Sequence, residues 1–557
     1  MLIFKAFGLQ IRTNGAYILT WLNCKSDLLF CIFTTENLFF CFFARLFHDH
    51  PTMRPYTICH NTVSLDMDQS PSNKVVVVGA GISGLTAAVY LQRSGFQTLI
   101  LEKTAGPGGV STSWKRKGYT FEGGIHWLIG AKEEIPLHQI WIETGALQEN
   151  NPVYFKDPIY TLVDREGTMP LFRDLHGLEI KGFRDRIALW RLRFHLACFK
   201  NFHQPISDLR GLKVRYPRPF SMGEYVKMLP AVLITPFLMA QSARGYAKRF
   251  KNKRIRALLA AIVEPDINAL SLIYTLGTFH VGDSGYPKGG SLRMAQNMAD
   301  TFLSLGGEIR YHTLVEEISK GEKDWVVRTK DEAITANAVV VSADARSAID
   351  TLFRVPLQDG WAKKMRLGLK TTQCMFLGVG VKVDLSSRPR SMQIMLPRPL
   401  DAAGRTYETV VVNNYAMEAG YAPEGCSVIT CLLHGPTYAY WKAAKEDGSY
   451  EAKKNKVMEN FLQVLGDVIP EIRDAVAVTD MATPLTYERY CGTFEGSYMT
   501  DWPPFSPLYH APIRYRKGLY FTGQRTAYSG GLPPAAQSGR TAAQTVCKDF
   551  GVEFIGH

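Results

Sequence analysis

The 557-residue sequence lacks the cysteine spacing of a metal-binding or disulfide-stapled domain. Its 10 cysteines form no CxxC pair, which argues against a structural zinc site and against a small secreted scaffold. We therefore expect free thiols in a reducing compartment. The sequence also lacks a Ser-His-Asp or HExxH constellation, and we predict no metal site.

Internal repeats and low-complexity tracts are absent as well. Hydrophobic residues make up 46% and charged residues 21% of the chain, which excludes intrinsic disorder as the dominant state. The length predicts two or three packed units. The balance of 64 Lys and Arg against 51 Asp and Glu, +13 in all, favours an anionic partner such as nucleic acid, an acidic membrane or a phosphate-bearing ligand. No nucleic-acid-reading motif accompanies these charges, so we expect no nucleic-acid partner.

Residues 1–72 differ from the rest of the chain, and we expect them to form an extension outside the core. The stretch 28–47 is apolar and rich in phenylalanine, but Glu36 and Asn37 make it a poor membrane-spanning helix. It also lacks the basic start and the small-residue cleavage site of a signal peptide. Three interpretations stay open: a membrane anchor, a targeting segment, or residues upstream of a true start at Met53 or Met67.

The core opens with a predicted strand, helix and second strand. Continuous valines at 74–78 predict a buried parallel strand, residues 85–94 have helical spacing, and residues 98–101 predict the next buried strand. Further apolar runs predict buried strands at 338–342 and 518–522, a second sheet that includes 393–396 and 409–413, and a helix at 535–547. Buried apolar strands occur near both ends of the chain, and they predict one nucleotide-binding domain that is assembled from distant segments.

A glycine fingerprint separates the first strand from the helix. In Gly79-x-Gly81-x-x-Gly84, the first glycine permits a tight turn and the second lets the backbone approach a pyrophosphate. The third lets the helix pack closely against the strand. Glu102 ends the second strand, where its carboxylate can accept hydrogen bonds from ribose hydroxyls. The segment therefore predicts a dinucleotide-binding unit.

A double glycine, Gly108-Gly109, follows the acidic residue and gives a second close backbone approach to a ligand. With this turn the sequence resembles the flavoprotein family of phytoene desaturases, carotenoid isomerases, retinol saturases and amine oxidases. The resemblance covers most of residues 73–550 and continues at 118–126, 286–290, 307–315, 483–496, 517–524 and 530–540. It implies FAD as the cofactor, which the fingerprint alone does not distinguish from NAD.

The fold that the resemblance implies is α/β. A glutathione-reductase-like FAD-binding domain, built on a Rossmann βαβ unit and discontinuous in sequence, is expected beside an α+β substrate domain with a mixed sheet and lid helices. The expected parts are an extension (1–72), FAD-binding parts (73–160, 276–345 and 481–557), a substrate and membrane-contact part (161–275) and the substrate-domain sheet (346–480).

The resemblance also implies a set of cofactor-binding residues. Two departures from the family pattern stand out: Gln524 replaces an aspartate, so a carboxylate role is lost, and Val110 replaces an arginine. The expected cofactor-binding residues are Gly79, Ala80, Gly81, Ser83, Gly84, Glu102, Lys103, Gly108, Gly109, Val110, Val315, Gly523, Gln524, Gly531 and Leu532.

His126 is the candidate catalytic residue, because the resemblance places it toward the flavin, where it could act as an acid or base. The alternative is a histidine whose hydrogen bonds are satisfied by the backbone of a buried turn. Lys288 and Tyr528 are weaker candidates: Lys288 as a flavin-side lysine or a solvent-facing turn residue, Tyr528 as part of the substrate face or as packing.

Residues 181–256 interleave basic and apolar side chains. Within them, the apolar stretch 229–240 contains Pro230 and Pro236, and we expect it to be too short and broken to span a bilayer. Two interpretations stay open: a surface that docks onto an anionic membrane, or a lid helix with a solvated basic face.

These expectations predict a membrane-associated FAD-dependent oxidoreductase. Its expected substrate is a hydrophobic polyene or isoprenoid lipid of carotenoid or retinoid type, whose C–C or C=C bonds it desaturates, saturates or isomerises, because a hydrocarbon site needs an apolar tunnel and few catalytic side chains. The alternatives are a flavin oxidase of an amine or other hydrophobic metabolite and a non-catalytic prenyl or lipid binder. The direction of the reaction, the electron acceptor and the oligomeric state are not specified by the sequence.

Overall fold

The computed structural model describes residues 73–203, 206–217, 222–507, 509–527 and 530–557, together with the backbone of four strands nearer the N-terminus. The chain divides into two units, Met1–Gln69 and Ser70–His557. In the first unit the strands form an antiparallel sheet in the order β1-β2-β3-β4, with bounds β1 Arg12–Thr13, β2 Ala16–Asn23, β3 Asp27–Thr34 and β4 Phe40–Arg45. The candidate starts Met53 and Met67 lie outside the described residues.

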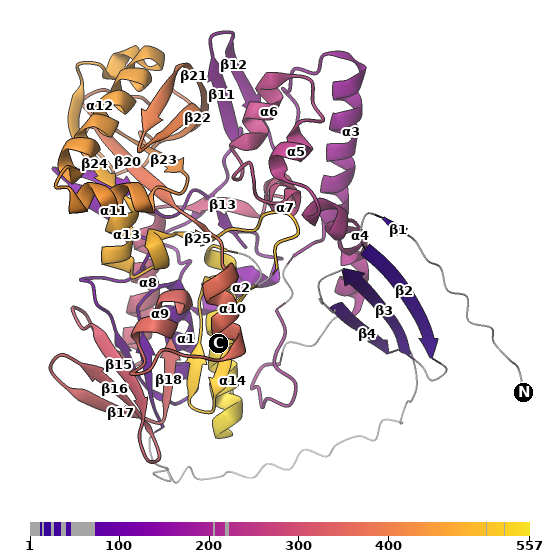
Figure 1. Cartoon of the computed structure of the whole chain (residues 1–557), viewed down its shortest axis with the longest axis vertical. Helices are drawn as coiled ribbons and strands as arrows, with labels where there is room; N and C mark the ends of the chain where they lie inside the picture. Colours follow the sequence, from indigo (N-terminus) through magenta and orange to yellow (C-terminus); the bar gives the residue numbers. More distant parts are fainter. Residues whose placement is uncertain are drawn as a thin grey trace, which may run out of the picture. The chain divides into compact units, whose positions relative to one another are not determined.

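A six-stranded sheet in the order β14-β6-β5-β18-β27-β26 brings together three distant parts of the second unit (Figure 1). All neighbouring pairs are parallel except β26 with β27. The predicted strands at 74–78, 98–101, 338–342 and 518–522 are confirmed to within one residue. The strands are β5 Lys74–Val78, β6 Gln97–Leu101, β14 Glu308–Arg310, β18 Ala338–Val341, β26 Arg514–Arg516 and β27 Leu519–Phe521.

Layers on both faces explain why these strands are continuously apolar. Val75 and Val77 face the core formed with α1, α8 and α14, while Val76 and Val78 face the opposite core with the β15–β16–β17 sheet and α9. The predicted helix at 85–94 begins earlier, and the predicted helix at 535–547 is longer at both ends. The covering elements are α1 Ile82–Arg93, α8 Gly290–Ser304, α14 Leu532–Phe550, α9 Ala345–Thr351, β15 Val315–Lys320, β16 Trp325–Thr329 and β17 Ala333–Ala336.

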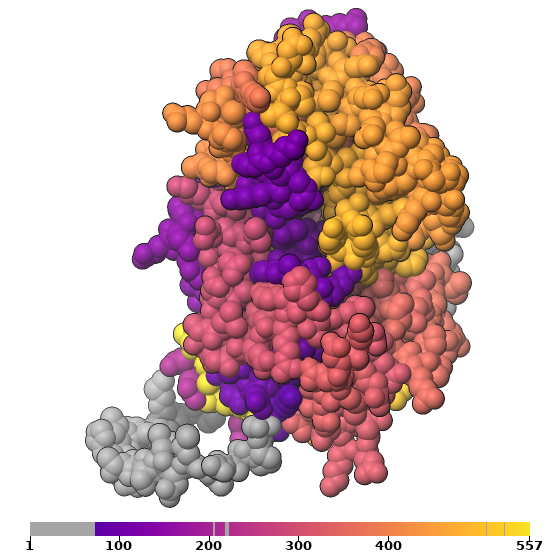
Figure 2. Space-filling model, turned by 90° about the vertical axis from the view of Figure 1, so that its left-hand side faces the viewer, coloured from indigo at the N-terminus to yellow at the C-terminus, as the bar shows by residue number. Residues whose placement is uncertain are grey.

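A second, seven-stranded sheet has the order β12-β11-β21-β22-β23-β20-β24 and is mixed, because β11 and β21 run parallel. The stretches 393–396 and 409–413 lie inside β21 and β22, as predicted. In Figure 2 the later strands of this sheet and their covering helices, coloured orange, lie above the salmon and pink segments. The bounds are β11 Tyr160–Asp164, β12 Gly167–Leu171, β20 Cys374–Val381, β21 Ser391–Ala402, β22 Arg405–Asn414, β23 Ser427–His434 and β24 Val476–Ala482, with covering helices α11 Tyr438–Glu446 and α12 Tyr450–Val468.

Shorter elements connect the two sheets. The helices are α2 Pro136–Glu143, α3 Gly182–Phe199, α5 Ala243–Ala247, α6 Lys253–Ala260, α7 Ala269–His280, α10 Gly360–Gly368 and α13 Pro484–Cys491, with single 3-10 turns at Pro470–Ile472, Phe494–Gly496 and Gln524–Thr526. The strands are β7 Ser113–Arg116, β8 Tyr119–Glu122, β9 Leu128–Ile129, β10 Val153–Tyr154, β13 Ser284–Pro287, β19 Thr371–Thr372 and β25 Met499–Thr500.

Helix α4, Met222–Met239, corrects one expectation. Pro230 and Pro236 do not break it: the chain forms a single helix of 18 residues, which by length and composition alone is sufficient to cross a membrane. Each proline removes only one backbone N–H donor from the helix. Next to Pro236, the Thr235 hydroxyl donates to the carbonyl of Ala231 at 2.9 Å. Most of the helix is exposed.

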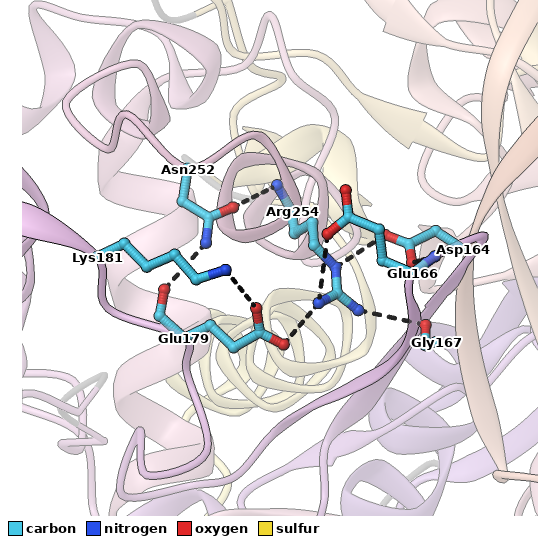
Figure 3. A network of polar contacts seen from close by, with 7 residues as sticks. All are labelled: Asp164, Glu166, Gly167, Glu179, Lys181, Asn252 and Arg254. Atoms are coloured by element: carbon cyan, nitrogen blue, oxygen red, sulfur yellow. Dashed lines mark hydrogen bonds and ion pairs between the residues drawn. The ribbon is translucent and has the colours of Figure 1, made fainter.

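Arg254 connects helix α6 to the β11–β12 hairpin and to Glu179 (Figure 3). From α6 its guanidinium contacts Asp164 at 2.8 Å and Glu179 at 2.6 Å, and it donates to the carbonyl of Gly167 at 3.2 Å. Asn252 caps the same helix by accepting from the amide of Arg254. Because Arg254 and Asp164 are both almost buried, each compensates the desolvation of the other and fixes α6 to the β11–β12 hairpin.

Arg254→Ala tests this contact. Removal of the cation leaves a nearly buried carboxylate at Asp164, and we expect the free energy of unfolding to fall by about 3–5 kcal/mol. The matched control is Arg244→Ala, which breaks the exposed pair with Asp266 and is expected to cost less than about 1 kcal/mol. Urea denaturation of both variants measures the difference, and equal losses would contradict the role assigned to Arg254.

Candidate functional site

A cleft lies at the carboxyl ends of the parallel strands β5, β6 and β18, where open α/β sheets bind their ligands. Its walls come from segments far apart in sequence. They include residues 78–79, 81–83, 101–103, 108–111, 313–315, 342–345, 347–348, 490–493, 498–499, 522–525, 531–532 and 535, with Gly124.

The first wall is the glycine turn between β5 and α1. Gly79 has φ +103°, and a Cβ on Gly84 would lie 2.1 Å from the carbonyl oxygen of Gly79. A Cβ on Gly81 would instead meet no atom within 4 Å. Gly81 is also the N-cap of α1 and carries no side-chain cap, so the first amides of the helix face open space in the cleft.

Glu102 braces this turn from the end of β6. One carboxylate oxygen accepts from the amide of Ala80 at 2.7 Å, and the other accepts from the amide of Thr104 at 2.8 Å and its hydroxyl at 2.7 Å. The neighbouring Lys103 donates to the carbonyl of Arg489 at 2.9 Å. Glu102 therefore orders the cleft wall as well as presenting a carboxylate to it.

The double glycine forms the floor next to this turn. Gly108 pairs with Gly81 through an isolated parallel bridge, and Gly109 has φ +61°. A Cβ on Gly109 would lie 3.4 Å from the Cα of Gly81, at ordinary contact distance, so the positive φ rather than crowding favours glycine at this position.

The C-terminal wall is built by the turn after β27 and by the start of α14. Gly523 has φ +112°, and its amide donates to the Ser538 hydroxyl at 2.8 Å. The Gln524 amide group donates to the carbonyl of Tyr498 at 2.8 Å and accepts from the amide of Gly531. Gly531 is the N-cap of α14, again with no side-chain cap, so a second helix N-terminus faces the cleft.

The structure brings together most of the predicted cofactor residues. All of them line the cleft except Ala80 and Gly84, which lie behind its wall, one bonded to Glu102 and the other packed on Gly79. Val315 lines the cleft at the start of β15. Lys288 is exposed in the turn after β13, and Tyr528 lies outside the described residues.

Residues 82–547 match the family of flavin-containing amine oxidoreductases. The chain belongs to this family.

Several curated relatives resemble it over most of their length. A prolycopene isomerase of Daucus carota is 24% identical over 88% of this chain and 82% of its own. An all-trans-retinol 13,14-reductase of Danio rerio is 23% identical over 81% and 82%, and a phytoene desaturase of Rhodobacter capsulatus is 24% identical over 85% and 94%. Among solved structures, a cyclohexylamine oxidase of Brevibacterium oxydans has a TM-score of 0.56 at 15% identity over 86% of this chain and 100% of its own, and shares the fold.

FAD is the cofactor of this flavoprotein, and the cleft fits it. The open space at Gly81 is a cradle that a Cβ would fill, and the uncapped N-terminus of α1 offers amides to a pyrophosphate. Helix α14 begins with Leu532 followed by two prolines, which have no N–H, so the Gly523 turn rather than this helix start brings backbone to the cofactor there. Glu102 supplies a carboxylate at the same wall, as ribose binding requires.

His126 lies two residues beyond Gly124 and is not among the residues that line the cleft in the described part of the chain. The Nδ1 atom of His126 lies 3.3 Å from the side-chain amide nitrogen of Asn413, and the backbone carbonyl of His126 accepts from the Lys156 ammonium group at 3.1 Å. Burial, then the charge of Lys156 and the nearby His434, lower the pKa of His126 to about 3. The ring therefore stays neutral at ordinary pH, and its protonated form is too scarce to serve as an acid.

Glu122 is a site residue that the sequence analysis missed. Its buried carboxylate accepts from the amides of Gly124 at 2.9 Å, Ile125 at 3.1 Å and Ser291 at 2.9 Å. Burial raises the pKa of Glu122, and these hydrogen bonds oppose the rise. Glu122 thus ties the cleft-lining Gly124 to the N-terminus of α8. In the sequence, the only indication of this role is the position of Glu122 between Phe121 and the glycine pair at 123–124.

Glu264, His434 and Tyr498 were also missed. They come from the α6–α7 connection, the end of β23 and the residue before β25, and they meet beside the cleft. Their sequence separation left no motif to find.

Gly81→Ala tests the cradle. The added methyl group meets no protein atom, so we expect the melting temperature of the flavin-free protein to be unchanged. It occupies the space that the pyrophosphate needs, so retained FAD should fall at least about tenfold.

Gly106→Ala is the matched control for this prediction. A Cβ there also meets no atom within 4 Å, but Gly106 does not line the cleft. FAD released on denaturation is measured by fluorescence for both variants. Wild-type FAD content in Gly81→Ala would contradict the assigned pyrophosphate position.

Proposed function

We propose that this flavoenzyme acts on C–C or C=C bonds of a hydrophobic polyene or isoprenoid lipid, of carotenoid or retinoid type. The observation that carries the proposal is the pairing of a glycine-built dinucleotide cleft with similarity, over 81–88% of the chain, to relatives named as a prolycopene isomerase, a retinol reductase and a phytoene desaturase. Desaturation, saturation and isomerisation all fit one scaffold.

The residues of the chain have separate parts in this proposal. The N-terminus of α1 and the Gly523 turn would hold the pyrophosphate, Glu102 would accept from ribose hydroxyls, and Gly124, fixed by Glu122, would lie on the flavin side of the cleft. FAD, when bound, would supply the exchange of hydride equivalents with the carbon chain. We assign the six-stranded sheet to a glutathione-reductase-like FAD-binding domain formed by residues 73–160, 276–345 and 481–557, and the seven-stranded sheet to the substrate domain.

We also propose that helices α3 and α4 dock on an anionic membrane from which the substrate is drawn. The two helices pack against each other and carry strongly exposed apolar side chains, among them Trp190 at 68% and Leu233 at 63%. Exposed basic residues surround them: Arg184, Arg186, Arg191, Arg193, Lys227, Lys248 and Lys251. Apolar area adds about 25 cal/mol per Å² on insertion, and each cation near the lipid headgroups about 1 kcal/mol.

The substrate class is tested by anaerobic half-reactions. Purified protein should be yellow, and reduced or oxidised flavin should react with at least one member of a panel of phytoene, lycopene and retinol, followed by absorbance and product analysis. Reaction with a panel of amines and with no polyene would replace the proposal with an amine oxidase. A colourless protein that binds lipid would indicate a non-catalytic carrier.

Membrane docking is tested with the double variant Trp190→Glu, Leu233→Glu. Carboxylates at these positions oppose insertion and repel anionic lipid, so co-sedimentation with phosphatidylserine-containing vesicles should fall severalfold. Leu367→Glu is the control, because Leu367 is 90% exposed on α10, away from both helices in sequence. Equal vesicle binding by the wild type, the double variant and Leu367→Glu would contradict docking through α3 and α4.

A further inference from the structure

Glu264, His434 and Tyr498 form a hydrogen-bonded cluster next to the cofactor cleft. The Nδ1 atom of His434 lies 2.6 Å from Oε1 of Glu264. The Tyr498 hydroxyl lies 3.4 Å from that same oxygen and 3.4 Å from the same Nδ1, and the tyrosine and histidine rings are 5.6 Å apart. Three separate segments of the chain are thus needed to build the cluster.

Tyr498 connects this cluster to the cofactor. It lines the cleft, and its carbonyl accepts from Gln524, which in turn contacts the N-cap of α14. The side chains of His434 and Glu264 are 32% and 20% exposed, so water reaches the far side of the cluster. The cluster therefore extends from the cleft wall toward solvent.

The hydrogen bonds define which atoms carry protons. A carboxylate only accepts, so His434 donates from Nδ1 to Glu264, and in the neutral form of the ring Nε2 holds the lone pair. The Tyr498 hydroxyl likewise donates to Glu264. Burial and the nearby charge of Glu264 raise the pKa of Tyr498, so the phenol is protonated at rest and its anion, once formed, readily takes a proton back.

Carbon–carbon bond chemistry of the proposed kind moves a proton as well as a hydride equivalent. The flavin accounts for the hydride, and the proton needs a group at the cleft. His126 is neutral and, with a pKa of about 3, poorly suited to the task. In the described part of the chain, Tyr498 is a cleft-lining residue whose hydroxyl contacts a histidine–carboxylate pair.

We propose that Tyr498 is the proton donor and acceptor of this site and that His434 and Glu264 connect it to water; this inference rests on the proposed function. In the saturating direction the carbon–carbon π bond breaks and two C–H bonds form. One carbon takes a hydride equivalent, with both electrons, from reduced flavin, and the other takes the Tyr498 proton. For this transfer the Tyr498 hydroxyl turns from Glu264 toward the carbon, and its oxygen then regains a proton from His434 Nδ1, 3.4 Å away. His434 Nε2 takes a proton from water, which leaves hydroxide in the solvent. Desaturation runs each transfer in reverse, with oxidised flavin as the hydride acceptor.

The test compares half-reactions of Tyr498→Phe, His434→Gln and the control His176→Gln, whose ring pairs with Asp174 on an exposed turn. With whichever polyene reacts with the wild type, Tyr498→Phe should slow the flavin half-reaction at least about 100-fold. His434→Gln should slow it less and raise its solvent deuterium isotope effect. Reoxidation of the reduced flavin by benzoquinone, which needs no proton at carbon, should be slowed far less than the polyene reaction in Tyr498→Phe and His434→Gln.

A second measurement does not depend on turnover. Ring ¹⁵N spectra of histidine-labelled protein, with His434 assigned from its loss in His434→Gln, should show a protonated Nδ1 and a bare Nε2, and Glu264→Ala should abolish this preference.

The outcomes separate the two proposals. A wild type that reacts with no polyene overturns the proposed function. A reactive wild type with undiminished Tyr498→Phe, or a His434 ring protonated on Nε2 alone, overturns the relay and leaves the substrate class standing. A benzoquinone reaction slowed as much as the polyene reaction would reduce Tyr498 to a structural role.

Discussion

The structure depends on a contact that leaves no room for a side chain. Helix α1 lies so close to the turn before it that a Cβ on Gly84 would sit 2.1 Å from the Gly79 carbonyl and 3.0 Å from the Cβ of Ser342. This packing holds the uncapped start of the helix at the carboxyl end of β5, between β6 and β18. Because those strands are parallel, Glu102 and the start of α9 arrive at the same edge. The cleft is thus a consequence of strand direction and of one tight helix contact.

The remaining walls are fixed to this frame by polar contacts. Arg525, which is buried, contacts Asp344 at 3.1 Å, and Asp344 caps α9. Glu122 fixes Gly124 to the start of α8, while Gln524 joins Tyr498 to the start of α14. The seven-stranded sheet contributes His434 from the end of β23 to the same region. One site therefore combines backbone amides for an anionic cofactor with hydroxyl, imidazole and carboxylate groups for proton movement.

Much of the frame could be predicted, because its signals are local. The valines of 74–78 specify a strand buried on both faces, and the fingerprint glycines sit where side chains are sterically excluded. The proton-handling groups could not be predicted in the same way. Glu264 and His434 are 170 residues apart, and only pairing of β23 within its sheet brings them together.

Two other outcomes depended on environment rather than on local pattern. The neutral state of His126 follows from burial and from Lys156, which no spacing in the sequence reveals. The continuity of α4 has a different explanation. Pro230 and Pro236 were expected to break the helix, but an exposed helix can lose two backbone hydrogen bonds and retain its others.

The most direct test of the account is a structure of the flavin-loaded protein with a polyene bound. The account predicts the pyrophosphate between the N-terminus of α1 and the Gly523 turn, the isoalloxazine beside Gly124, and the Tyr498 hydroxyl close enough to a reacting carbon to transfer a proton. A flavin seated elsewhere, or a polyene separated from the ring by the Tyr498 wall, would contradict it.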